Sequence, residues 1–200
     1  MSKLETNTID TVSGTNTLQV GDGNVATINL GKSGDTINIP SGATITNSGT
    51  ANGFGGANTP AFFAHKTGNQ TVAQDTQVLV AFETEIFDTN NTFTNTSGNY
   101  KFTPGVSGKY VIHASLYFAT PAAGNFHRLY VYKNGSSYAE LGQSNNGYEE
   151  GVNMSTIVDS DTNDYFQIYT RHNKGSSITV QGNTTWGDVV SGFGAYKLIT

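Results

Sequence analysis

Apolar side chains in residues 57–200 recur at every second position, in short runs separated by clusters of Gly, Asn, Ser, Thr and Asp. This period places the apolar side chains on one face of a strand, and short runs are typical of antiparallel sheets. The longest run covers 109–119, where five alternate residues share a face that we expect in the core: Tyr110, Ile112, Ala114, Leu116 and Phe118. Residues 82–112 show no helical period.

The alternation predicts about ten short strands, a number that fits a jelly-roll sandwich. The main runs are 61–65, 78–82, 100–102, 109–119, 126–133, 154–158, 165–171, 178–180 and 189–199. Asn134-Gly135 predicts a hairpin turn after 126–133, because both residues accept a positive φ. We expect 136–153 to form a polar loop and 159–164 to form a turn.

Residues 1–56 carry a different, repeating pattern. Pairs of apolar residues two positions apart are each followed by a turn that ends in Gly, and the apolar positions are Leu18, Val20, Ile28, Leu30, Ile37, Ile39 and Ile45. Each pair lies on one face of a short strand, which a single chain leaves open to water. Such repeats gain a core by stacking or by joining other chains. We expect these residues to line a stalk of three chains; the alternative is a flexible linker.

The boundary between the two patterns lies near Gly53-Phe54-Gly55-Gly56, a natural hinge because Gly accepts backbone angles closed to other residues. Residues 1–56 include ten Thr, ten Gly and seven Asn but one aromatic residue. A segment of that composition buries too little apolar surface to fold alone. We therefore expect a β-rich stalk over 1–56 and a separate head over 57–200.

Part of the head follows a fixed order of residue types. The order is Phe82, five residues, Asp88, four residues, Phe93, then Phe102, five residues, Gly108, one residue, Tyr110, one residue, Ile112. This resembles the signature of the C1q domain, the globular head related to tumour necrosis factor, with a two-residue insertion between Phe93 and Phe102. Residues 61–64 and 191–196 resemble the opening and closing strands of that family. The resemblance implies a C1q-like jelly-roll sandwich and a homotrimer around a threefold axis.

Two N-terminal segments resemble parts of bacteriophage tail fibres. Residues 34–51 are similar to the repeats of their stalks, and residues 2–9 to the start of such chains. The resemblance implies a virion protein, assembled in the host cytoplasm and exposed on the particle. Its expected partners are two further copies of itself, another virion protein at the N-terminal segment, and a glycan or protein of the host surface.

Composition excludes several other classes. The formal charge is -5 and the ten basic residues are scattered, which disfavours nucleic acid because that binding rests on clustered Lys and Arg. The chain contains no cysteine, so a disulfide framework and a Cys-based metal site are excluded. It has no apolar run of signal-peptide length and no 18-residue apolar segment, so we expect neither export by that route nor membrane insertion.

The titratable residues form no recognised catalytic or metal motif. The four histidines have no sequence neighbours that make a triad or a metal helix, and His113 lies on the outward face of 109–119, where it could meet a neighbouring chain. Asp159, Asp161 and Asp164 lack the glycine and distal glutamate of a calcium loop. We therefore expect no enzyme activity, no cofactor and no bound metal.

Candidate receptor-binding residues occur in two predicted loops, 136–153 and 182–188. Tyr138, Tyr148, Glu149 and Trp186 combine aromatic rings with hydrogen-bonding groups, which suits sugar or protein surfaces. The alternative is that the rings plug the ends of the sandwich.

The sequence therefore favours a tail fibre or fibre tip that binds the host. Three alternatives remain open: a capsid decoration protein or head fibre, a generic C1q-like carbohydrate- or protein-binding module, and a glycan-cleaving tail protein. The last needs paired carboxylates in a groove, whereas the acids of the head lie mainly in predicted turns.

Overall fold

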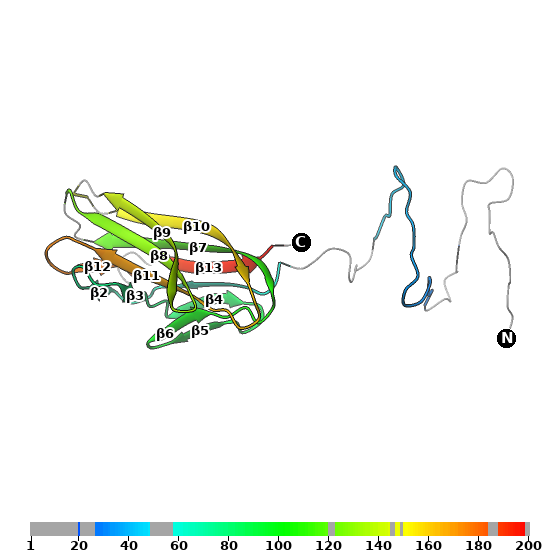
Figure 1. Cartoon of the computed structure of the whole chain (residues 1–200), viewed down its shortest axis with the longest axis horizontal. Coiled ribbons are helices and arrows are strands. Elements are labelled where there is room, and N and C mark those ends of the chain that lie inside the picture. The colour runs from blue at the N-terminus through cyan, green and yellow to red at the C-terminus, as the bar shows by residue number, and fades with distance from the viewer. Residues whose placement is uncertain are drawn as a thin grey trace. The chain divides into compact units, whose positions relative to one another are not determined.

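Alternating apolar residues build two antiparallel sheets in the head, as seen in the computed structural model (Figure 1). The structure describes residues 20, 27–48, 58–119, 123–144, 147–148, 150–183 and 188–198. Thirteen strands lie in this described part, and every pairing between them is antiparallel. The chain divides into two units, Met1–Ala51 and Asn52–Thr200.

The first sheet has seven strands and the second has six. The first runs β2 (Gln70–Val72), β12 (Ile178–Val180), β7 (Gly108–Ala119), β13 (Gly192–Lys197), β1 (Ala61–His65) and β4 (Thr84–Asp88), and β10 (Glu150–Ser160) also pairs with β7. The second runs β5 (Phe93–Thr96), β6 (Asn99–Phe102), β11 (Phe166–His172), β8 (Phe126–Lys133) and β9 (Ser136–Ser144), and β3 (Val78–Leu79) also pairs with β11.

The core lies between the two sheets and is rich in phenylalanine. The core face expected on β7 is confirmed, since its five residues are 0–3% exposed. At the centre, the Phe62 ring stacks on Phe93 at 4.6 Å and on Phe102 at 4.8 Å, and meets the edge of Phe193 at 4.9 Å. Because Phe62 belongs to the first sheet and Phe93 and Phe102 to the second, this stack joins the two layers.

The polar loop predicted over 136–153 is wrong. It contains β9 and the start of β10, and β9 pairs with β8 through a register shift between Val131 and Tyr132. The side chains of β9 are almost all exposed, so the strand carries no buried alternation for the sequence to reveal. β4 was not predicted for the same reason, whereas the Asn134-Gly135 turn is confirmed with φ of 53° and 78°.

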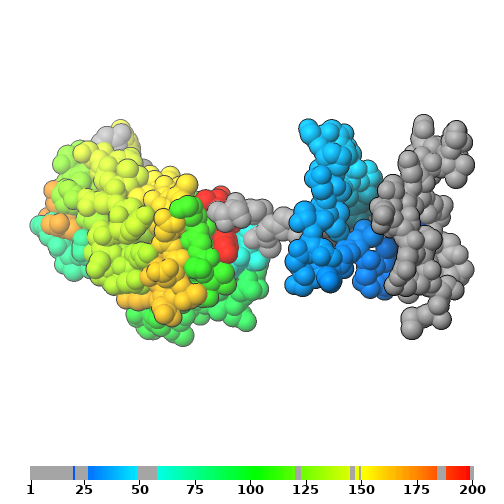
Figure 2. Space-filling model, turned by 45° about the vertical axis from the view of Figure 1, so that its right-hand side comes forward, coloured from blue at the N-terminus to red at the C-terminus, as the bar shows by residue number. Residues whose placement is uncertain are grey.

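β9 and β10 belong to different sheets but lie side by side at one edge of the head (Figure 2, yellow-green and yellow-orange). The Tyr138 hydroxyl on β9 donates a hydrogen bond to the Ile157 carbonyl on β10 at 3.2 Å. This contact closes the sandwich along that edge.

A buried lysine closes the sandwich beside β1. Lys66 is 1% exposed, and its Nζ contacts Glu83 Oε1 at 3.1 Å and the Ala81 carbonyl at 3.2 Å. Burial lowers the pKa of Lys66 while Glu83 raises it, so the charged form depends on this partner. The pair ties the end of β1 to the segment before β4.

Gly182 packs against backbone, and its replacement by alanine is a direct test of this fit. An added Cβ would lie 2.3 Å from the Thr67 carbonyl oxygen and 2.8 Å from that of Gly68. Backbone cannot swing away as a side chain can, so we expect Gly182→Ala to lower the free energy of unfolding by about 2–3 kcal/mol. Denaturant unfolding would measure this, with Gly142→Ala as control, because the nearest atom there is a flexible Arg128 side-chain carbon at 3.6 Å. Equal losses in the two variants would contradict the prediction.

The described residues of the N-terminal unit contain turns and no strand. The amide of Asp35 bonds to the Lys32 carbonyl and that of Ala43 to the Pro40 carbonyl, with Gly34 and Gly42 at positive φ in the third position of each turn. The expected apolar residues are all exposed by 46–67%: Val20, Ile28, Leu30, Ile37, Ile39 and Ile45. Leu18 lies outside the described residues. A single chain lacks the neighbouring strands to which the backbone of such a stalk would hydrogen-bond. The division into a stalk over 1–56 and a head over 57–200 therefore stays a prediction.

Candidate functional site

The outward side of the first sheet carries a row of aromatic and glycine residues. We call it the glycine–aromatic face and define it by Phe63, Phe87, Val111, His113, Ile157, Gly192, Gly194 and Tyr196. The registers of the strands place Phe87, Phe63, Gly194 and His113 side by side across β4, β1, β13 and β7. The inward neighbours of these residues fill the core, so this side of the sheet faces out.

Glycine makes this face flat. The Phe63 and His113 rings stack at 5.8 Å with an interplanar angle of 16°. A Cβ on Gly194 would lie 2.5 Å from His113 Cε1, and one on Gly192 would lie 2.7 Å from Phe63 Cζ. The rings of Phe63 and His113 therefore pack directly against the backbone of the two glycines, and a side chain at either position would displace them.

The same face exposes large apolar side chains within a polar border. Ile157 is 58% exposed, Phe87 48% and Tyr196 38%. Lys109 and Asp159 form an ion pair of 2.5 Å in the cross-strand position next to Ile157. Burial lowers the pKa of His113, so the imidazole near the centre of the face favours its neutral form. A flat apolar patch with charges at its border has the composition of a protein interface.

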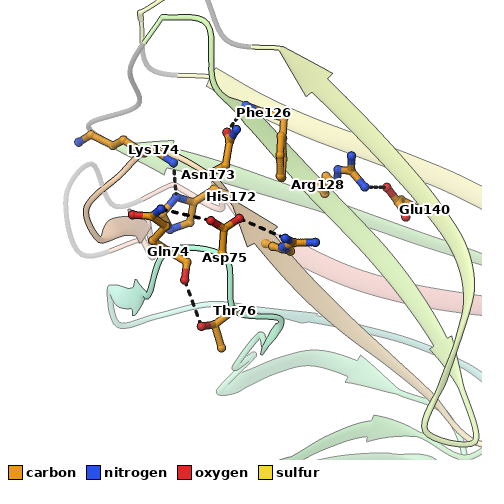
Figure 3. Close-up of polar contacts among 10 residues, drawn as sticks. Gln74, Asp75, Thr76, Phe126, Arg128, Glu140, His172, Asn173 and Lys174 are labelled. Carbon is orange, nitrogen blue, oxygen red and sulfur yellow. Dashed lines mark hydrogen bonds and ion pairs between the residues drawn. The ribbon is translucent and has the colours of Figure 1, made fainter.

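The outward side of the second sheet is different in character. We call it the arginine–tyrosine face and define it by Asp75, Gln77, Phe126, Arg128, Tyr130, Tyr132, Glu140, Tyr169 and Arg171. The two arginines of the chain, Arg128 and Arg171, stand directly opposite each other on β8 and β11. Arg128 pairs with Glu140 at 2.5 Å and Arg171 with Asp75 at 3.1 Å (Figure 3).

Both guanidinium groups lie near one ring. Arg128 is 4.4 Å and Arg171 5.7 Å from the centre of the Phe126 ring. A hydrogen bond with Tyr130 and the charge of Glu140 raise the pKa of Arg128, and a hydrogen bond from Gln74, together with Arg171, lowers the pKa of Asp75. The face thus pairs two guanidinium groups with two carboxylates, whose formal charges cancel.

Three tyrosines continue this face along β8 and β11. The Tyr132 ring lies 4.2 Å from Tyr169 and 6.2 Å from Tyr130. The Tyr132 hydroxyl donates a hydrogen bond to Gln77 Oε1 at 2.5 Å, and burial raises the pKa of Tyr132. The rings are thus fixed against each other, with Tyr130 buried at 2% exposure and Tyr132 and Tyr169 half-buried.

A buried histidine pair lies under the end of this face. His127 is 0% exposed, stacks on Phe118 at 4.8 Å and pairs through Nδ1 with Glu150. His172 Nε2 donates to the Val72 carbonyl at 2.9 Å. Its Nδ1 accepts a hydrogen bond from the Lys174 amide (Figure 3). Burial lowers the pKa of His172, which suits this neutral tautomer. These contacts tie β2, β8, β10 and β11 together.

The acidic turn 159–164 is held by protein groups. Asp164 accepts hydrogen bonds from Lys133 Nζ at 2.8 Å, Asn134 Nδ2 at 2.6 Å and the Asp161 amide at 2.7 Å. These donors, Lys133 first, hold the pKa of Asp164 at about 2. Beside the turn, an open pocket of about 260 Å³ is lined by Ser107, Gly108, Lys133, Asp159, Ser160 and Asp161. No cluster of three or more metal-binding side chains occurs in the described residues.

Asp164→Asn should lower stability in a pH-dependent way. The pKa of this carboxylate is lower in the folded chain than its ordinary value of 3.8, so its contribution is complete above pH 3.8 and is lost as the pH falls through about 2. We expect a loss of about 1–2 kcal/mol at pH 7, allowing for solvent screening, and a much smaller loss at pH 2. Unfolding at several pH values would show this. Asp161→Asn is the control, because its carboxylate has no hydrogen bond in the described part of the chain; a pH-independent loss in Asp164→Asn would contradict the prediction.

The predicted receptor residues are only partly placed. Tyr138 is on β9 and is 47% exposed, and Tyr148 is 75% exposed. Glu149 and Trp186 lie outside the described residues. Receptor binding by these four residues therefore stays a prediction.

Sequence reasoning missed the arginine–tyrosine face. A usable signal existed, because the two arginines of the chain fall in two of the predicted strands. The two arginines meet because β8 pairs with β11, and the sequence of neither strand alone predicts that pairing.

Comparison with known proteins shows a fold and no established family. No family model matches the chain. The uncharacterized protein YqcC of Bacillus subtilis (strain 168) is 32% identical over 131 residues, which are 60% of this chain and 35% of that protein. The chain therefore spans about a third of the length of this relative.

Two solved structures are similar in fold. The Eiger TNF from S. frugiperda aligns with a TM-score of 0.50 and 13% identity, covering 69% of this chain and 91% of that one. The PRD1 vertex protein P5 aligns with a TM-score of 0.51 and 16% identity, covering 72% and 99%. The head is thus a C1q/TNF-like sandwich of two antiparallel sheets, which confirms the all-β sandwich expected from the sequence, while the β-repeat stalk and the homotrimer stay predictions. The described residues contain no helix of a length and hydrophobicity that would span a membrane.

Proposed function

We propose that this chain is a non-enzymatic, trimeric structural protein of a virus particle, a tail fibre or fibre tip that binds the host surface. The observation that carries the proposal is the glycine–aromatic face. Ile157, Phe87 and Tyr196 expose apolar area there around two rings laid flat over glycine. In a single chain this area is in water, whereas contact with further copies of the chain would bury it.

Three copies rather than two are favoured by the fold class and by the N-terminal unit. C1q and tumour necrosis factor heads, which the sequence resembles, associate around a threefold axis. The exposed apolar residues at 28–45 need other chains to cover them, and a closed cyclic trimer supplies these along one axis. A trimer carries three identical outer surfaces, so weak binding at each gives tight attachment overall.

Location on a virus particle is supported by two likenesses. Residues 34–51 resemble phage tail-fibre repeats, and a solved structure with the same fold is a vertex protein. That second likeness also favours the alternative role, a capsid decoration protein or head fibre that stabilises the shell or tethers the particle. In both roles another virion protein would hold the N-terminal segment.

Light scattering of the full chain on a sizing column tests assembly, and adsorption to host cells tests attachment. A mass of three chains together with competition against particle adsorption supports the fibre. A trimer without such competition favours decoration. A monomer would remove the proposal and leave a generic C1q-like binding module. New reducing ends after incubation with host polysaccharide would show that the chain is an enzyme.

A further inference from the structure

The arginine–tyrosine face is costly to build and has no role in the core. Arg128 and Arg171 are the only arginines among 200 residues, yet they stand directly opposite each other, where like charges repel. Each needs its own carboxylate, Glu140 or Asp75, to offset this. Both guanidinium side chains remain 35% exposed. Packing of the sandwich does not require such an arrangement.

The polar groups of this face are held in place before any ligand arrives. The guanidinium of Arg128 lies over Phe126 at 4.4 Å and is paired with Glu140, while Tyr132 is held by Tyr169 and Gln77 (Figure 3 shows the arginine end). Binding to fixed groups loses little conformational entropy. In addition, Arg171 Nε is buried without a hydrogen-bond partner in the described part of the chain.

The chemistry of the face matches a polyhydroxyl ligand. Guanidinium groups only donate hydrogen bonds and carboxylates only accept them, and here one of each stands together twice. A sugar hydroxyl both donates and accepts, so neighbouring hydroxyls of one ring can bond to both members of such a pair. The half-buried rings of Phe126, Tyr132 and Tyr169 supply apolar area beside these pairs for the C–H side of the sugar.

Other ligand classes fit this face less well. Asp and Glu are depleted in protein interfaces whereas Arg and Tyr are enriched, so the two carboxylates of this face, Glu140 and Asp75, set it apart from the glycine–aromatic face. An anionic ligand would meet two carboxylates on the face and a chain of net charge -5. The charges of the face cancel, which favours a neutral ligand.

We propose that the arginine–tyrosine face binds a neutral saccharide of the host surface, through Arg128–Glu140, Arg171–Asp75 and the rings of Phe126, Tyr132 and Tyr169. This inference rests on the proposed attachment function and names its receptor class. The two sheets lie face to face, so this face points away from the glycine–aromatic face and stays accessible when that face is covered by other copies.

The test uses the full chain on a microarray of neutral and acidic oligosaccharides, followed by titration calorimetry with the neutral sugar that is bound. We expect wild type to bind neutral sugars, and Arg128→Ala or Arg171→Ala to weaken binding at least tenfold. The double variant R128K/R171K keeps both charges but loses the planar forks, so it should bind as weakly. Lys101→Ala, which removes a cation from the same sheet, should bind like wild type, and thermal unfolding would check that every variant is folded.

Three results would overturn the inference: no binding to any sugar, binding confined to acidic sugars, or full binding by folded R128K/R171K. Mass and adsorption to host cells separate it from the proposed function. If the trimer adsorbs to cells equally well with and without the two arginines, the saccharide site is wrong but the proposed fibre function still stands. If the chain binds neutral sugars but neither forms a trimer nor adsorbs to cells, the proposed fibre function is wrong but the saccharide site still stands.

Discussion

Ile157→Glu is expected to convert the proposed trimer into monomers at micromolar concentration. Ile157 is 58% exposed on the glycine–aromatic face, so in the free chain a carboxylate there would stay in water and cost little. In the proposed trimer it would be buried without a partner at every copy of the interface. An uncompensated buried charge costs about 3–5 kcal/mol, and a threefold assembly contains it three times.

Light scattering and thermal unfolding together measure this effect. The expected result is a fall in mass from three chains to one while the β-rich circular dichroism spectrum is kept. Leu141→Glu is the matched control, since Leu141 is 41% exposed on β9 of the second sheet and should stay trimeric. An Ile157→Glu chain that remains a trimer would show that this face is not the interface, and dissociation of both variants would show a nonspecific effect of charge.

Phe62→Ala should produce the largest loss of stability. The Phe62 side chain is 1% exposed and contacts three other rings at 4.6–4.9 Å, from both sheets. Truncation of a buried phenylalanine costs about 3–5 kcal/mol, and lost ring pairs add to that. Since a domain has about 5–15 kcal/mol in all, we expect much of the head to be unfolded near its working temperature.

Denaturant unfolding at fixed protein concentration would measure the loss, because self-association shifts apparent stability. Phe62→Leu refills part of the space and should cost less than half as much. Ile86→Ala, at a residue 55% exposed on β4, should change stability by less than about 0.5 kcal/mol. A loss below about 1.5 kcal/mol for Phe62→Ala would mean that the ring stack does not join the sheets as described.

Much of the fold could be predicted because a strand with one buried face alternates apolar and polar residues along the sequence. β7 and β8 bury alternate side chains, and the predicted ranges agree with the structure to within one residue. β9 and β4 lie at sheet edges with nearly all side chains exposed, so no period marks them, and the sequence predicts a loop where β9 lies. Edge strands are defined by hydrogen bonds to a neighbour, which a local pattern does not show.

The candidate surfaces were less predictable than the fold. His113 was placed on the outward side of its strand, as the structure has it, because alternation alone decides that. Its stacking on Phe63 over Gly194 depends on β1, β13 and β7 pairing in one register, and these segments are far apart in the sequence. The four predicted receptor residues lie in segments that the sequence predicts as loops, where no hydrophobic period indicates which side chains face outward.

The sequence by itself determined that the head is all-β, which side chains of β7 enter the core, where Gly34, Gly42 and Asn134-Gly135 turn the chain, and that the sandwich is of the C1q/TNF type. The strands, the core face and the turns follow from local side-chain periods and from residues that accept a positive φ, whereas the C1q/TNF type follows from the resemblance to that family's signature. Only the tertiary structure decided that Phe62 bridges the sheets, that glycines flatten the first sheet and that Arg128 meets Arg171 on the second. Each of these depends on strand register and layer packing, which arise from hydrogen bonds and close contacts between distant segments.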